Sequence, residues 1–333
     1  MENLQQQTLN KNKFEFIKVP NSMFYEKVKD EITGNYSSIE GWFKDMNDNN
    51  IIMILTYLQT RVNWVDEVYF TIDELIKFCG QVPKNGKGKT RCKMKALLNN
   101  LKNKGIINTD IDFTTIKYSE IIKVKYDPIN SIKDERWVRI PTNIINKISS
   151  IKNCDTKIAL TLWSYLHCRR YIKNINSIAT KGERASSTTV SYDYIIRDTG
   201  FANDTIKKYN DILVNNGLLL KHNSGYLKKG KEIKECYNIY VTVDNTLEEA
   251  QAFMKEAVSM YEKDMKQKGY SIIHKTKEEK KSIRKNKRKT SPQSGVTHDE
   301  ESPTDFDSNI TYEEYTKIQE QEAEINNMLS KLF

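Results

Sequence analysis

The sequence predicts an α+β protein in which one small domain occurs twice in tandem, followed by a helix and a charged C-terminal region. The main observation is that three separated blocks of residues return in the same order further along the chain. One such match could arise by chance, but three in the same order indicate a duplicated domain of about a hundred residues. The corresponding blocks are residues 16–21 and 137–142, 70–80 and 190–200, and 97–107 and 209–219.

The composition is that of an intracellular globular protein rather than a secreted or membrane protein. The 333 residues leave room for two domains and an extension, and 38% of them are hydrophobic. Five cysteines occur, none in a CxxC spacing, so we expect neither a disulfide framework nor a zinc site. No run approaches the roughly 20 apolar residues of a membrane helix. We therefore expect a cytoplasmic protein without a membrane segment.

Charge is distributed unevenly along the chain. The formal net charge is +9, but the residues after Thr290 include ten acidic and only two basic side chains. The remainder of the chain is therefore far more basic than the total indicates. So basic a stretch of chain favours a polyanionic partner. Nucleic acid is favoured over membrane because no lipid-facing amphipathic helix is evident.

The first copy, residues 14–126, has the periodicities of three helices and three strands. Thr71 begins the second helix as its cap, with Glu74 three residues later as in a capping box, and Gly80 ends it. The third helix has an apolar stripe at steps of three and four residues, which predicts that one side is buried. In order, the expected elements are a helix at 50–61, a strand at 68–70, a helix at 71–79, a helix at 89–104 and strands at 106–107 and 116–124.

The second copy, residues 135–243, repeats this order. Asp155, Ser191 and Asn203 are expected to cap its three helices, and strands at 217–220 and 236–241 enclose a turn. Helix, strand, helix, turn, helix and two-stranded hairpin is the order of elements in a winged helix. In that fold the third helix reads DNA and the hairpin forms the wing. We therefore expect two tandem winged-helix domains and a double-stranded DNA partner.

The outward face of the third helix in the first copy is predicted to contact DNA. No acidic residue lies between Glu74 and Asp110, whereas a solvated helix face normally carries both signs of charge. A face of one sign is better explained by contacts with phosphate groups. The candidate DNA-binding residues here are Lys84, Lys87, Lys89, Thr90, Arg91, Lys93, Lys95 and Asn99.

The third helix of the second copy has an outward face of mixed sign, because Asp204 and Asp211 accompany its lysines. Asparagine suits adenine and lysine suits guanine, so base reading is one interpretation and a protein interface is the other. The wing is the clearer phosphate contact. The candidates are Asn203, Thr205, Lys207 and Lys208 on the helix and Lys228, Lys229 and Lys231 on the wing.

No group of residues predicts catalysis, a metal ion or a cofactor. Residues 86–90 read Gly-Lys-Gly-Lys-Thr, but Pro83 stands where a P-loop needs its first glycine, and the segment follows a predicted helix. The four histidines are scattered without ligand spacing, and His167 is interpreted as a packing residue. We expect a binding protein rather than an enzyme.

The C-terminal third is predicted to contain two helices joined by a linker. A helix at 245–270 either docks on the second domain or pairs with another chain in a homodimer. Residues 271–310 are expected to be a disordered linker, first basic and then acidic, and residues 1–13 a disordered arm. Residues 311–333 are expected to form an acidic helix with an apolar stripe, which is typical of a partner-docking peptide. Its docking residues are Ile325, Met328, Leu329, Leu332 and Phe333.

Three strings in the first copy resemble a known module: Phe-Ile-Lys-Val-Pro-Asn at 16–21, Phe-Thr-Ile-Asp-Glu-Leu at 70–75 and Lys-Gly-Ile-Ile at 104–107. They are similar to the winged-helix module of plasmid and phage replication initiators from AT-rich, low-GC bacteria. The resemblance implies binding to repeats at an origin, recruitment of a helicase, its loader or another replication protein, and location on plasmid or nucleoid DNA. A transcriptional or partition regulator with the same core is the alternative, and a protein-interaction scaffold is a third interpretation.

Overall fold

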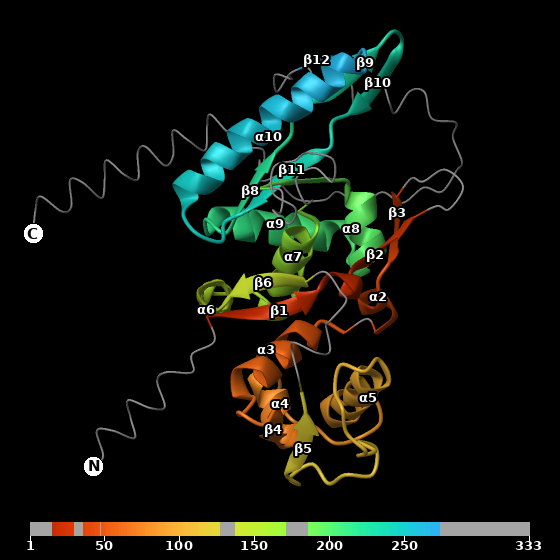
Figure 1. The fold of residues 1–333 in the computed structure, drawn as a ribbon, viewed down its shortest axis with the longest axis vertical. Helices are drawn as coiled ribbons and strands as arrows, with labels where there is room; N and C mark the ends of the chain where they lie inside the picture. Colours follow the sequence, from red (N-terminus) through yellow and green to blue (C-terminus); the bar gives the residue numbers. More distant parts are fainter. Residues whose placement is uncertain (1–14, 30–35, 47, 127–136, 171–185, 274–333) are drawn as a thin grey trace, which may run out of the picture.

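The computed structural model describes residues 15–29, 36–46, 48–126, 137–170 and 186–273, and these form a mixed α+β structure (Figure 1). The predicted N-terminal arm, most of the linker and the docking residues at 325–333 lie outside the described residues. The first half contains β1 (Phe16–Pro20), η1 (Asn21–Met23), β2 (Tyr25–Lys29), β3 (Tyr36–Glu40), α2 (Trp42–Met46), α3 (Ile51–Arg61), β4 (Glu67–Phe70), α4 (Ile72–Phe78), α5 (Thr90–Asn103) and β5 (Ile122–Lys125). The second half contains β6 (Trp137–Pro141), α6 (Thr142–Ser150), α7 (Thr156–Cys168), β7 (Thr188–Val190), α8 (Tyr192–Thr199), α9 (Asn203–Asn215), β8 (Leu219–His222), β9 (Tyr226–Lys229), β10 (Glu232–Glu235), β11 (Asn238–Thr242), α10 (Leu247–Gln267) and β12 (Ser271–Ile273).

One order of elements occurs in both halves of the chain. The series α3, β4, α4, α5 and β5 in the first half corresponds to α7, β7, α8, α9 and β11 in the second. In each half the first of these strands pairs antiparallel with the last, β4 with β5 and β7 with β11. β8 completes the second sheet beside β11, and a single bridge between Asn108 and Lys125 lies at the matching place in the first half.

The two halves are joined by a small sheet made from the first pair of recurring sequence blocks. β1 and β6 pair antiparallel, with Lys18 opposite Arg139, and these two residues also occupy matching positions in the recurring blocks. The sheet therefore has a local two-fold axis that passes between them. Its inner face is fully buried and consists of Ile17, Val19, Val138 and Ile140.

The hydrophobic core is continuous between the two halves. α3 packs against β1 and α7, while α2 packs against α8. Phe24 lies edge-on to Tyr165 with ring centroids 5.5 Å apart, and the Tyr25 hydroxyl donates to the carbonyl oxygen of Cys168 at 2.8 Å. Buried side chains from both halves form one cluster. The halves therefore hold each other in a fixed relative orientation.

Three helix caps lie where the sequence signals predicted them. Thr71, Asp155 and Ser191 each accept a hydrogen bond from a backbone N–H group in the first turn of their helix. Gly200 ends α8 with a φ of +71°, a conformation that glycine adopts without steric cost. These signals fix the boundaries of α4, α7 and α8.

The prediction that Asn203 is a helix cap is wrong, and the helix expected at 245–270 begins at Leu247. α9 begins after Ala202 and has no side-chain cap, so Asn203 is its first residue. Thr246 caps α10, because its hydroxyl accepts the N–H of Glu249 at 3.2 Å. The Asn245 amide instead donates to the Glu249 carboxylate at 3.1 Å.

The return strand predicted at 116–124 is shorter in the structure, where only Ile122–Lys125 pairs with β4. The preceding residues form a loop. The Asp112 carboxylate accepts hydrogen bonds from the backbone N–H of Thr114 at 2.9 Å and from its hydroxyl at 2.7 Å. This local turn competes with strand pairing, as short polar side chains often do.

The hairpin of the second half is divided into two sheets. β8 pairs with β11 near the core, whereas β9 and β10 form the outer part. The division occurs at Asn223, whose amide donates to the carbonyl oxygen of Cys236 at 3.0 Å and accepts the N–H of Gly225 at 2.8 Å. Residues 271–273, which the sequence predicted to begin the linker, form β12 and pair with β9.

α10 docks on the second half, which was the first of its two predicted arrangements. Ala250 and Met254 are buried in a cluster with Ile239 and Val241 of β11. Tyr240, which lies between these two residues on the strand, belongs to the main core on the other side. β11 is therefore covered on both faces, and α10 supplies one of the covers.

We expect Met254→Ala to lower the free energy of unfolding by about 2–5 kcal/mol, because it removes a buried side chain and leaves a cavity. Met260 on the same helix is 58% exposed and provides the matched control. Met260→Ala should change stability by less than about 0.5 kcal/mol. Urea denaturation of both variants measures the difference, and equal losses would show that α10 is not docked as described.

Candidate nucleic-acid interface

The loop before α5 has a defined shape set by Thr90 and two glycines. The Thr90 hydroxyl donates to the carbonyl oxygen of Val82 and accepts the N–H of Lys84, both at 2.8 Å. Gly86 and Gly88 have φ values of +116° and +72°, which residues with a side chain rarely adopt. Thr90, predicted to contact DNA, therefore shapes the loop and positions the lysines around it.

Four lysines are exposed at the beginning of α5 without a counter-charge. Lys84, Lys87 and Lys89 project from the loop, and Lys93 lies one turn into the helix. None of the four side chains forms an ion pair or hydrogen bond with any residue that the structure describes. The first turn of α5 contains no acidic residue either. The helix dipole adds further positive potential at this end of α5.

Arg91 has a structural role. Its guanidinium binds both oxygens of the Asp73 carboxylate, with the Nε–Oδ1 distance at 2.7 Å, and donates to the Asn85 side chain at 2.8 Å. Tyr118 lies 4.7 Å from it, measured to the ring centroid. The hydrogen bond from Arg91 lowers the pKa of Asp73 below its usual value. Arg91 therefore fastens α5 to α4, and its predicted contact with DNA stays untested.

Lys95 and Asn99 hold a loop against one side of α5. The Lys95 ammonium donates to the carbonyl oxygen of Thr114 at 3.0 Å and lies 4.6 Å from the Tyr118 ring centroid. The Asn99 side chain accepts the N–H of Phe113 at 3.2 Å. The loop covers this side, so the exposed part of α5 is narrower than the sequence indicated. It consists of Lys93, Ala96, Asn100 and Asn103, at steps of three and four residues.

α9 presents its predicted candidates on an exposed but electrically mixed face. Asn203, Lys207 and Lys208 are exposed, as is Asp204, whereas Thr205 is half-buried. The opposite side of the helix is buried through Ile206, Tyr209, Asn210 and Leu213. The structure therefore leaves both interpretations of this helix open.

The wing carries two kinds of lysine. Lys228 and Lys231 are exposed, and neither side chain forms an ion pair or hydrogen bond with a described residue. The Lys229 ammonium donates to the carbonyl oxygen of Lys268 at 3.0 Å and lies 5.2 Å from the Tyr270 ring centroid. The residues after α10 therefore hold the wing in place, which the sequence did not predict. The sequence signal for the strand β12 is the β-branched pair Ile272–Ile273 after the helix.

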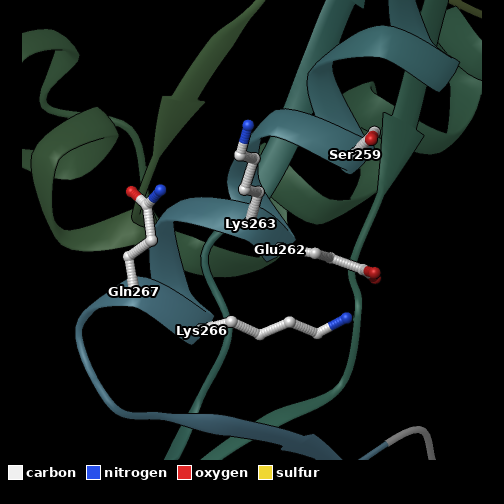
Figure 2. Close-up of a pocket in the computed structure, with 5 residues that line it drawn as sticks. All are labelled: Ser259, Glu262, Lys263, Lys266 and Gln267. Carbon is white, nitrogen blue, oxygen red and sulfur yellow. The ribbon is translucent and has the colours of Figure 1, made fainter.

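Other features of the described residues do not converge on a chemical site. No group of three or more His, Cys, Asp or Glu side chains is arranged to hold a metal ion among them. A hollow beside α10 is lined by polar side chains of that helix alone, and these diverge (Figure 2). His167 is buried, stacks on Trp163 at 4.6 Å and lies 2.6 Å from the Thr242 hydroxyl, so it packs as predicted. In the described part of the chain, no helix is long and apolar enough to cross a bilayer.

Comparison with known proteins adds no family to this description. The chain matches no protein-family model and no curated protein.

We expect Asp73→Asn to reduce the free energy of unfolding by about 1–2 kcal/mol at neutral pH, because Arg91 loses its ionised partner. Since the folded-state pKa of Asp73 is lowered, its contribution is complete above the unfolded-state value near 3.8. It is lost as the pH falls through the lower folded-state pKa. The difference in the free energy of unfolding between wild type and variant should therefore become smaller in acid.

Urea denaturation at pH 7 and at pH 3 measures this change. Asp110 is exposed and makes no ion pair with a described residue, so Asp110→Asn is the control and should show no gap at either pH. A gap for Asp73→Asn that stays constant down to pH 3 would contradict the assigned role of the ion pair.

Proposed function

We propose that this protein binds double-stranded DNA through two tandem winged-helix units. The shared order of elements supports the units, because α5 and α9 each follow a helix–strand–helix series, and the strand of each series pairs with a strand that follows the third helix. In the second half the three strands lie in the order β7–β11–β8, and β9–β10 extends from them as a wing. Under this proposal, α5 and α9 are the helices that enter the grooves.

The observation that carries the proposal is the cluster of unpaired lysines at the start of α5. Lys84, Lys87, Lys89 and Lys93 are exposed and have no counter-ion among the described residues. Holding four like charges close together is unfavourable in isolation and becomes favourable beside phosphates, whose condensed counterions are released on binding. The structure gives Arg91, Lys95 and Asn99 internal partners, so they are supporting residues in this proposal.

The second half would supply a further contact. Lys228 and Lys231 on the wing suit backbone phosphates, and Asn203 and Lys207, exposed on α9, would meet base edges. A regulator and a replication initiator would share this core. The resemblance to plasmid and phage initiators favours the second role, with residues 311–333 recruiting a replication protein, and a transcriptional or partition regulator is the alternative.

The test is the salt dependence of duplex binding. We expect a variant with glutamine at positions 84, 87, 89 and 93 to bind more weakly, with the slope of log K against log salt reduced by about three to four. The control has glutamine at Lys147, Lys152, Lys263 and Lys266, four exposed lysines elsewhere that carry the same total charge. Fluorescence anisotropy with a labelled duplex measures both slopes. Identical slopes for variant and control would remove this surface from the DNA site, and a wild type without affinity would refute the proposal.

The proposed recruitment role is tested by deleting residues 311–333. This removes an acidic segment, so DNA affinity should stay equal or rise slightly, while maintenance of the plasmid or phage should be lost. Anisotropy and a maintenance assay in the host measure the two effects. Normal maintenance by the truncated protein would contradict recruitment through this segment.

A further inference from the structure

The outer face of the β1–β6 sheet carries two cations and two aromatic rings. Lys18 and Arg139 alternate along their strands with Phe16 and Trp137, while the residues between them point to the core. All four side chains are at least partly accessible to solvent. The face lies in the middle of the molecule, between the half that carries α5 and the half that carries α9 (Figure 1).

The two cations are held directly opposite each other. The backbone N–H and C=O of Lys18 both form hydrogen bonds with the side-chain amide of Gln59, each at 2.7 Å, so these two backbone groups point away from β6. Lys18 and Arg139 are therefore a non-hydrogen-bonded cross-strand pair, the kind with the shorter Cα separation. Like charges at such a position are unfavourable.

Aromatic rings partly offset this repulsion, and no carboxylate of the described residues does. The Lys18 ammonium lies 4.5 Å from the Trp137 ring centroid, and the Arg139 guanidinium lies 4.6 Å from that of Phe16. The guanidinium is also 5.5 Å from the Trp137 centroid, so both cations sit near one indole ring. Within the described residues, neither cation forms an ion pair, and Glu15, exposed just before β1, does not form one either. An anion bound between the two would relieve the repulsion.

We propose that Lys18 and Arg139 form a phosphate-binding site at the junction of the two halves, occupied by a backbone phosphate of the bound duplex. Arg139 offers a planar fork of donors and Lys18 a compact point charge, a combination that suits a phosphate group. The central position of the sheet suits a phosphate that lies between the DNA segments bound by α5 and by α9. The assignment of DNA as the occupant rests on the proposed function, whereas the argument for an anion site rests on the β1–β6 sheet alone.

The first test is a double variant, Lys18→Gln with Arg139→Gln, in the full chain. Compared with wild type, duplex affinity should fall about tenfold and the salt slope by about one, since one phosphate contact is lost. Lys263→Gln with Lys266→Gln is the control, because it removes the same charge from α10. Thermal denaturation must show that all three proteins are folded at the assay temperature.

The second test uses inorganic phosphate as the probe. At constant ionic strength, phosphate in place of chloride should raise the Tm of wild type and of the control, and should have a smaller effect on the double variant. A double variant equal to the control in both tests would overturn the site. A difference only in the phosphate test would overturn the DNA backbone as occupant. If wild type does not bind DNA, the proposed function fails, and the phosphate test alone then decides whether the anion site exists.

Discussion

The pairing of β1 with β6 is the interaction on which the rest of the structure depends. These strands lie far apart in the sequence, and each begins one half of the chain. Their inner side chains are fully buried beneath α3 and α7, which lead into the two helix–strand series. The burial of apolar surface on this sheet, together with the packing of α3 on α7 and of α2 on α8, therefore sets the distance and angle between α5 and α9. For a ligand that contacts both helices, the β1–β6 sheet and this packing fix the spacing between its two contacts.

Cations in the first half are divided between two tasks. Arg91 and Lys95 form contacts inside the protein, and through them α4, α5 and the following loop become one unit. Lys84, Lys87 and Lys89 stand on the loop that this unit holds in place, and their charges face solvent. Rigid support for exposed charge reduces the ordering cost of binding. In the proposed function, the internal cations therefore hold the exposed lysines in position for the ligand.

Local signals in the sequence predicted local structure well. Thr71, Asp155 and Ser191 act as caps because their side chains bond within one turn, and the order of helices follows from apolar periodicity. Long-range pairing was not predictable in the same way. Lys95 looks like a surface cation in the sequence, and only the fold brings the carbonyl oxygen of Thr114 to it. The same holds for β12, whose partner β9 lies more than forty residues earlier in the chain.

The local two-fold axis between Lys18 and Arg139 relates parts of one chain, not two identical chains. In a homodimer the axis would force both recognition faces to be the same. Here they differ, since lysine is the one kind of charged residue on the exposed face of α5, whereas the exposed face of α9 carries Asp204 as well as lysines. For the proposed DNA ligand, unlike faces favour a target without palindromic symmetry. The protein would then bind its site in one direction only, with α5 over one half of the sequence and α9 over the other.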